Sequence, residues 1–178
     1  MKYITKLILV SILTFLCLQS CNSHIEKYTK QENKIISGEG LEAFKIKQTS
    51  IDEVITTLGK DYEEINHNEY SIEIIYKKLG LSFYYLLKDE EKKLFTIKFS
   101  APFNGITDKG FKIGDTLQSV IDIYGTPNWY SCDACDVWRA TYEDIGLEFV
   151  VNRDKTLPHF PLNEEVHLQK KITRICVQ

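Results

Sequence analysis

The sequence has no surplus of basic residues, and this absence argues against a nucleic-acid partner. It contains 22 lysine and arginine residues against 25 aspartate and glutamate residues, a formal net charge of −3. Proteins that bind nucleic acid usually carry a basic surplus. Five cysteines in 178 residues are also too few for a disulfide scaffold. We therefore expect no nucleic-acid partner and a fold that does not depend on crosslinks.

Motifs of the common enzyme classes are missing as well. The chain lacks a serine elbow, a phosphate-binding loop, a zinc-protease helix motif and a dinucleotide fingerprint. Its composition, 43% hydrophobic and 26% charged, is that of a globular protein able to bury a core without metal or disulfide help. We expect a protein that is not an enzyme and that needs no cofactor or metal.

The strongest signal that is present is an export sequence at the amino terminus. Lys2 and Lys6 precede a mostly apolar run from Leu7 to Leu18. As a helix, this run would span roughly 18 Å, well short of the ~30 Å hydrocarbon core of a bilayer. It therefore indicates a signal peptide, residues 1–20, rather than a permanent membrane span.

The run ends in Leu18-Gln19-Ser20-Cys21, which resembles the bacterial lipoprotein signal. The resemblance implies cleavage before Cys21, a diacylglycerol thioether on its sulfur, and acylation of the new amino terminus with a fatty acid such as palmitate. Several acyl chains anchor a protein stably, whereas a single chain holds it only marginally. The alternatives are an uncleaved apolar segment with a chance cysteine, or an ordinary secretory signal cut elsewhere.

Residues 21–40 are polar and show no sustained periodicity, so we expect them to form a lipidated flexible tether. Without residues 1–20 the chain has 20 basic and 25 acidic residues, a net charge of −5. Membrane attachment would then depend on the lipid and not on charge. Asn22 is not the aspartate associated with inner-membrane retention in many Gram-negative lipoproteins. The cell envelope is therefore the expected location, with the outer membrane favoured.

The rest of the chain contains two similar segments. Phe44-Lys45-Ile46 recurs 67 residues later as Phe111-Lys112-Ile113. A second set of residues recurs 66 positions later, namely Val54-Ile55, Gly59, Tyr76, Gly80-Leu81 and Phe83. This coincidence predicts a tandem repeat, with one copy in residues 41–103 and the other in residues 104–178. Two similar but unrelated helix-and-strand units are the alternative.

Each segment predicts a short helix followed by strands. Apolar stripes indicate helices at 51–58 and 117–124, ended by Gly59 and Gly125, and Ser50 with Glu53 forms a capping box. Strands are expected at 70–76, 81–87, 94–99, 137–142, 147–151 and 172–177. We expect an α+β fold of two tandem repeats, each a short helix and about three antiparallel strands, with the helices packed on one sheet face. The two units either continue one sheet or pack side by side.

The segment 111–127 resembles the signature of the SmpA/OmlA superfamily. It contains Lys-Ile-Gly-Asp-Thr-Leu at 112–117, then Val120, then Tyr-Gly-Thr-Pro at 124–127. That superfamily includes the small lipoprotein of the outer-membrane barrel-assembly machine and the tandem-repeat β-lactamase-inhibitor proteins. The resemblance implies helices packed on an antiparallel sheet and a binding rather than a catalytic role. The first segment departs from it, with Lys47 in place of the glycine and Lys60-Asp61 in place of the residue-proline pair.

Cys132 and Cys135 form the only recognisable chemical motif. A redox dithiol of the thioredoxin type places its first cysteine at a helix amino terminus after a strand, whereas this pair follows a helix and precedes a strand. In an exported protein we expect a structural disulfide, either within the pair or from one of them to Cys176. Free thiols and a redox or metal site are the alternatives.

Two groups of residues are candidates for partner binding. The connection 152–170 is long, and long loops in compact domains are often functional; its apolar residues are Leu157, Phe160 and Leu162. Trp129 and Tyr130 are of the type that dominates binding hot spots, although large aromatics also fill cores. The histidines and acids of the same loop fit no metal-ligand spacing, so we expect a solvated loop.

Together these features predict a lipid-anchored bacterial envelope protein that acts as a non-catalytic protein-binding module. It would be a subunit of an envelope complex or an inhibitor or immunity-like protein. The alternative is an envelope thiol-redox protein or enzyme using Cys132 and Cys135. Replacing both cysteines by serine separates them, since the first hypothesis predicts a loss of stability only and the second a loss of activity.

Overall fold

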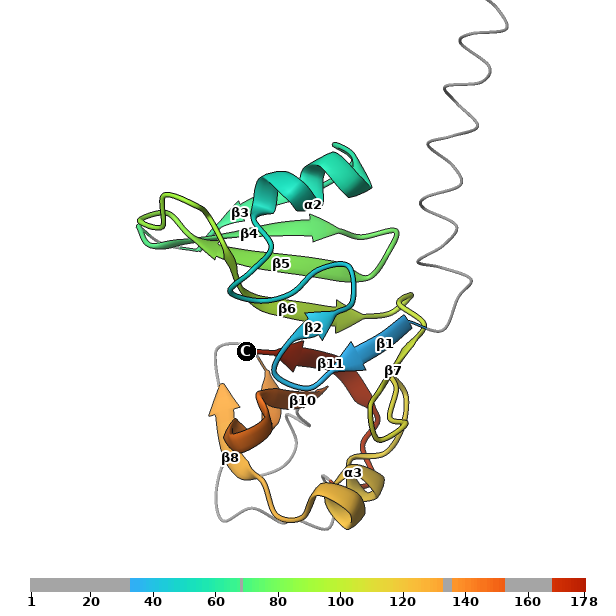
Figure 1. Cartoon of the computed structure of the whole chain (residues 1–178). Coiled ribbons are helices and arrows are strands. Elements are labelled where there is room, and N and C mark those ends of the chain that lie inside the picture. Colours follow the sequence, from blue (N-terminus) through green and yellow to red (C-terminus); the bar gives the residue numbers. More distant parts are fainter. Residues whose placement is uncertain (1–32, 68, 133–135, 153–167) are drawn as a thin grey trace, which may run out of the picture.

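The computed structural model describes residues 33–67, 69–132, 136–152 and 168–178, with the side chains of Ser131 and Cys132 left aside. Most of the chain forms strands, arranged in an eight-stranded antiparallel sheet and a three-stranded sheet (Figure 1). The strand order in the large sheet is β3-β4-β5-β6-β11-β10-β9-β8. In the small sheet the order is β2-β1-β7.

In the large sheet β3 to β6 are consecutive along the chain, and so are β8 to β10, whereas β7 and α3 separate β6 from β8. The strands of this sheet are β3 (Glu63–Asn66), β4 (Ser71–Tyr76), β5 (Leu81–Leu86), β6 (Leu94–Ser100), β8 (Asn128–Cys132), β9 (Val137–Tyr142), β10 (Leu147–Asn152) and β11 (Ile172–Val177). The last strand lies between β6 and β10, so that Val177 is opposite Ile97 on one side and Leu147 on the other. It thereby joins the earlier and later strands into one sheet.

The small sheet contains β1 (Asn33–Ile36), β2 (Gly40–Leu41) and β7 (Gly105–Thr107). Its first strand runs parallel to β7 and antiparallel to β2. Two α-helices, α2 (Ile51–Leu58) and α3 (Leu117–Tyr124), lie near opposite ends of the large sheet in Figure 1. A 3₁₀ turn, η1 (Glu143–Ile145), connects β9 to β10.

Both helices begin and end where the sequence predicts. The Ser50 hydroxyl accepts a hydrogen bond from the Glu53 amide, and the Glu53 carboxylate accepts one from the Ser50 amide at 2.7 Å, which confirms the capping box. Gly59 and Gly125 end the helices with φ angles of 85° and 84°, values that favour glycine. The six predicted strands are also confirmed within one or two residues.

The core lies between the large sheet and the layer formed by the helices and the small sheet. Its largest fully buried side chains include Phe44, Phe83, Phe99 and Phe149, and the rings of Phe44 and Phe83 meet edge to face at 5.3 Å. Each of these rings removes enough apolar surface from water to stabilise the fold by roughly 2–3 kcal/mol. The helices contribute through one buried side each, for example Val54 and Val120.

The predicted fold class is wrong. We expected an α+β fold of two tandem repeats, each a helix with about three strands, whereas the structure is mostly β and shows no two tandem helix-plus-strand repeats. Strands β1, β2, β3 and β7 were missed because they have only two to four residues. The four residues of β3, for example, are all exposed and show no apolar alternation. Strand β8 was missed although it contains Trp129 and Tyr130. The pairing of β11 with β6 also places a strand of the predicted second unit beside one of the first.

Part of the predicted tether belongs to the fold. Residues 33–40, assigned to the tether from their polarity, include β1, whose Ile35 is fully buried in the core. Asn33 pairs with Gly105 at the start of the parallel ladder to β7. The segment was predicted to be a tether because its main apolar residues, Ile35 and Ile36, are adjacent and show no alternating strand pattern. The remaining tether and the predicted signal peptide, residues 1–32, lie outside the described residues.

Within residues 33–178, as far as they are described, no helix is long and apolar enough to cross a membrane.

Candidate functional site

The two faces of the large sheet differ in character because successive side chains of a strand point to opposite sides. One face carries the apolar residues of the core, such as Phe83 and Phe149. The other, which we call the second face, points away from α2 and α3. None of the described helices and strands covers it.

Polar and charged residues occupy the centre of the second face in register. One row across the strands contains Ser82, Lys98, Cys176, Glu148, Thr141 and Asn128. The neighbouring row contains Ser100, Arg174, Val150, Arg139 and Tyr130. Lys98, Arg139 and Glu148 each stand between two core residues of their own strand. Arg174 stands between Thr173 and the core residue Ile175.

Glu73 is the centre of one polar network on this face. Its carboxylate lies 2.6 Å from His67 Nε2 and 3.8 Å from Lys98 Nζ, and it is hydrogen-bonded to Tyr84. Burial, the largest single influence, acts to raise the Glu73 pKa, but the hydrogen bonds and the lysine charge outweigh it and hold the pKa below its ordinary value. Lys98 donates a hydrogen bond to the Tyr84 hydroxyl. This carboxylate is therefore fully engaged.

Glu148 is the second buried acid of the face, and it is engaged too. Its carboxylate accepts hydrogen bonds from Thr141 at 3.3 Å and from Gln178 at 3.4 Å. Arg139 Nη1 lies 3.8 Å away, which is an ion pair too long for a hydrogen bond. The glutamate side chain is only 7% exposed, whereas that of Arg139 is 40% exposed.

Arg174 has no such partner. It is half-buried on β11, and its side chain makes no hydrogen bond or ion pair with any residue that the structure describes. Together with Lys98 and Arg139 it lines a groove of about 530 Å³, which we call the cationic groove. Tyr84, Glu148 and Val150 also line it. The groove holds three cations and one acid in a chain whose net charge is negative.

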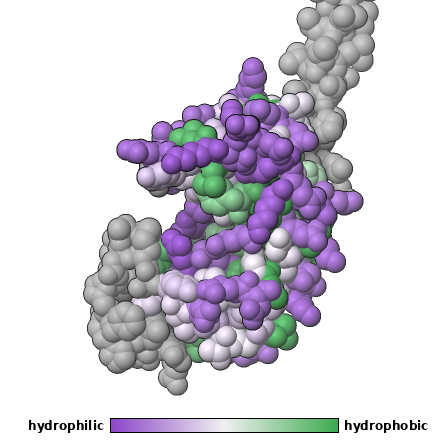
Figure 2. Space-filling view, turned by 60° about the vertical axis from the view of Figure 1, so that its left-hand side comes forward, coloured by the Kyte–Doolittle hydropathy of each residue, from purple (hydrophilic) through white to green (hydrophobic). Residues whose placement is uncertain are grey.

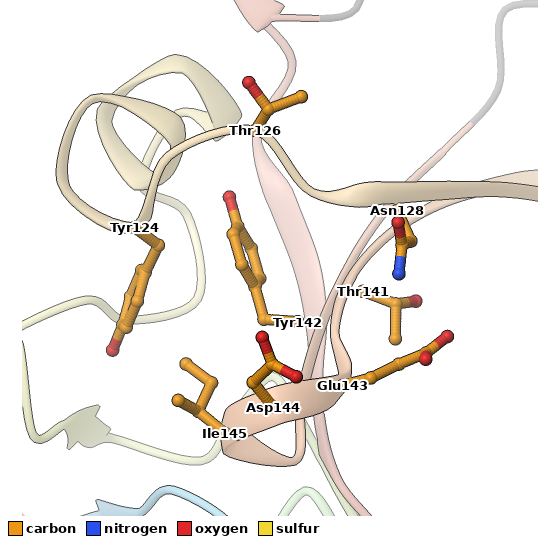
Figure 3. Close-up of a pocket in the computed structure, with 8 residues that line it drawn as sticks. All are labelled: Tyr124, Thr126, Asn128, Thr141, Tyr142, Glu143, Asp144 and Ile145. Carbon is orange, nitrogen blue, oxygen red and sulfur yellow. The ribbon is translucent and has the colours of Figure 1, made fainter.

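A second, smaller pocket of about 290 Å³ lies at the end of the sheet (Figure 3). Tyr124, Tyr142 and Asp144 point into it from α3, β9 and η1. The Tyr142 hydroxyl donates to the Gly125 carbonyl at 2.9 Å and the Tyr124 hydroxyl to Asp108 at 3.0 Å. Burial raises the pKa of both phenols to about 12. Neither can act as a proton carrier at neutral pH, so this pocket is the weaker candidate.

The described residues offer little for nucleophilic or metal chemistry. Burial raises the pKa of the Cys176 thiol to about 12, which leaves it protonated and unreactive near neutral pH. No group of three or more histidine, cysteine or acidic residues in the described ranges is arranged to hold a metal ion. What the second face offers instead is charge and hydrogen bonding, the chemistry of recognition.

Two of the predicted binding residues fall on opposite faces of the edge strand β8. Trp129 packs partly against the core, opposite Ala140. Tyr130 lies on the second face, 48% exposed, and donates a hydrogen bond to Glu143 at 2.8 Å. They therefore cannot form one aromatic contact surface. The predicted loop residues Leu157, Phe160 and Leu162, and the lipidation site Cys21, lie outside the described residues.

Of the three cysteines predicted to form a disulfide, only Cys176 is fully described. Cys176 is a free, buried thiol, and it lies on β11, three strands from β8, which carries Cys132. Strands stand ~4.8 Å apart, so these two Cα atoms are well beyond the ~7 Å limit for a disulfide. A Cys132–Cys176 bond is therefore not compatible with this strand order. Cys135 lies outside the described residues.

Sequence reasoning missed the groove residues Lys98, Arg139 and Arg174. A signal was available, because each is the single cation of a mainly apolar strand. Such isolated charges mark the solvent side of a strand, and three of them in neighbouring strands form a patch. Their proximity could not be deduced, since it depends on the insertion of β11 between β6 and β10.

Comparison with known proteins supports the fold and assigns no function. No family model matches the sequence, and no curated protein matches it. The uncharacterized protein yfeY from Escherichia coli has a similar structure, with a TM-score of 0.56 at 12% identity over 83% of this chain and 99% of that one. A cysteine-rich secretory protein (SAV1118) from Staphylococcus aureus matches with a TM-score of 0.42 at 11% identity. The match covers 85% of this chain and 48% of the SAV1118 chain. At these identities the likeness to yfeY concerns the fold alone.

Proposed function

We propose that this protein is a bacterial cell-envelope lipoprotein, anchored through Cys21, whose second face binds a protein partner without catalysing a reaction. The observation that carries the binding role is the set of charged side chains at the centre of that face, among which Arg174 has no partner within the described ranges. The export and lipidation signal of residues 1–21 supports the location.

The energetics of the second face support a binding role. Charges that lie in the middle of a sheet lose part of their hydration, and this costs stability unless partners compensate for it. An apolar or uncharged side chain at position 174 would fit the fold at least as well. A residue that costs stability where it stands is often retained for function.

The size of the face is also suitable. Eight strands at ~4.8 Å spacing span roughly 34 Å, and a standard protein interface buries about 800 Å² on each partner. Figure 2 shows one side of the molecule, on which hydrophilic residues dominate and hydrophobic ones form small separate patches. On the second face, the rows through Lys98 and Arg174 are largely polar and charged. Such rows suit a partner that is recognised through charge and hydrogen bonds.

The position of β1, the first described strand, is compatible with anchoring. Strand β1 packs through Ile35 into the core, on the side of the sheet opposite the second face. A chain tethered ahead of Asn33 would therefore be held from the helix side. The second face would remain accessible to a partner.

Photo-cross-linking in the cell envelope tests this proposal. Benzoylphenylalanine would replace Thr96, which lines the cationic groove, and in a separate variant Ile123, which is 62% exposed on α3. We expect a discrete cross-linked protein from position 96 and none from position 123. The absence of an adduct from position 96, or the same adducts from both positions, would contradict binding through the second face.

A further inference from the structure

We propose that the cationic groove binds carboxylate side chains of an acidic, extended segment of the partner, with Arg174 and Arg139 as the anchoring groups. This inference rests on the proposed function and specifies the chemistry of the partner. It follows from the charges, the register and the lining of the groove.

The charges of the second face do not balance within the groove. Glu148 is shared between Thr141, Gln178 and a long contact to Arg139. The nearby Glu73 is taken up by His67 and Tyr84, with Lys98 at 3.8 Å. No described carboxylate is left for Arg174. Among the described residues the groove therefore carries an excess of positive charge, which an acidic partner would complement.

The register of the strands sets the spacing of the two arginines. Arg174 and Arg139 lie opposite Val150 from its two sides, so their Cα atoms are two strand spacings, roughly 10 Å, apart. A guanidinium group pairs with a planar carboxylate through two parallel hydrogen bonds. In an extended peptide, every second side chain points to the same side, and these side chains are about 7 Å apart. The two arginine side chains are flexible enough to bring their guanidinium groups to that separation. The spacing favours two carboxylates along a peptide over one compact anion.

The floor of the groove strengthens such contacts. Val150 and Cys176 line the groove and are each 2% exposed, so buried apolar groups rather than water lie beneath the cations. Charge pairs at a surface of low polarity interact more strongly than in open water. Burial lowers the pKa of Lys98, and the neighbouring Arg174 and Arg139 lower it further, against the opposing effect of Glu73. A bound carboxylate would relieve this repulsion between the cations.

Binding of defined peptides to the full chain in mild detergent tests the inference. The probe is a fluorescein-labelled peptide of five Gly-Glu repeats, and its neutral match contains Gly-Gln repeats; fluorescence anisotropy gives the affinity. We expect the acidic peptide to bind and Arg174→Gln to weaken it about tenfold, since a charged hydrogen-bonded contact contributes roughly 1.5 kcal/mol. Lys109→Gln removes an exposed cation in the turn before α3 and should leave the affinity unchanged.

Three results would overturn the inference. Equal binding of the Gly-Gln peptide would show that the carboxylates are not recognised. An equal loss of affinity in Lys109→Gln would show that only net charge matters. Displacement of the peptide by inorganic phosphate at about 10 mM and constant ionic strength would assign the groove to a compact anion.

Thermal melting controls for misfolding of the variant. Arg174 has no described partner, so the melting temperature of Arg174→Gln should match that of the wild type.

Cross-linking from position 96 separates this inference from the proposed function. If a protein is cross-linked equally in wild type and in Arg174→Gln, the binding role stands and the acidic-segment inference fails. If the Gly-Glu peptide binds through Arg174 while position 96 captures no protein, the groove recognises carboxylates but the proposed function fails.

Discussion

Arg139 and Arg174 lie on the same face of the large sheet, each directly opposite Val150 on the strand between them. The first has a distant carboxylate partner in Glu148 and the second has none among the described residues. Two like charges thus flank one buried valine in the middle of a folded sheet. This arrangement does little for the fold, and it explains why we assign recognition to the second face.

The first prediction concerns the cost of this arrangement. Replacing Arg174 by leucine removes a half-buried charge that no described residue pairs with, so the free energy of unfolding should stay within about 0.5 kcal/mol of the wild type or increase. Arg139→Leu should instead lower it by roughly 0.5 kcal/mol, a modest value because Arg139 is partly exposed to solvent. Urea unfolding measures both. A marked loss of stability in Arg174→Leu would mean that this arginine serves the fold.

The second prediction concerns the hydrogen bond that links each helix to the large sheet. The Tyr142 hydroxyl donates to the carbonyl of Gly125, which ends α3, and the Tyr76 hydroxyl donates to Gly59, which ends α2. Tyr142→Phe leaves that carbonyl without its partner, so it should lower the free energy of unfolding by about 1 kcal/mol. Tyr130→Phe, at an exposed site, is the control and should change it little. Equal effects in the two variants would show that the buried hydrogen bond contributes nothing specific.

The third prediction is a dependence of stability on pH. Because the Glu73 pKa is lower in the folded protein than its ordinary value of 4.5, the unfolded chain takes up its proton first as the pH falls. The stabilisation from Glu73 is therefore complete above that value and is lost as the pH falls through the lower folded pKa. Glu73→Gln should lose less stability than the wild type between about pH 5 and pH 3.

The control for this experiment is Glu90→Gln. Glu90 is exposed in the turn between β5 and β6 and makes no ion pair with any described residue. Its variant should follow the wild-type curve. If Glu73→Gln follows that curve as well, the network around His67 and Tyr84 does not stabilise the ionised carboxylate.

The fourth prediction tests the anchor. Mass spectrometry of protein from the membrane fraction should find an amino-terminal Cys21 carrying acyl chains and no residues 1–20. Cys21→Ser removes the only nucleophile suited to the thioether, so the variant should retain the full amino terminus and carry no lipid. A wild-type chain that is uncleaved, or cleaved elsewhere without lipid, would contradict the lipoprotein assignment.

Local structure could be predicted from this sequence, whereas its assembly could not. The capping box at Ser50 and the glycines at 59 and 125 act over a few residues, so the pattern placed α2 and α3 correctly. The alternating strands were found for the same reason. Strand β1 was missed because its partner, β7, is about 70 residues away in sequence, and its place in the fold depends on that pairing.

The same limit applies to the candidate site. Each groove cation is visible in the sequence as a single charge in an apolar strand, but the groove exists only because β11 lies between β6 and β10. Aromatic residues were chosen instead, and the structure places Trp129 partly in the core and Tyr130 on the second face. Residue type therefore identified one exposed aromatic of the second face and none of its charges.

The most direct test of the central assignment compares two exposed side chains on opposite sides of the sheet. Tyr130→Asp places a negative charge on the second face, and Ile123→Asp places the same charge on α3. The measured quantity is the amount of the protein cross-linked from position 96 that co-purifies with each full-length variant. We expect co-purification to be reduced by Tyr130→Asp and unchanged by Ile123→Asp. The opposite pattern, or no effect of either change, would contradict binding through the second face.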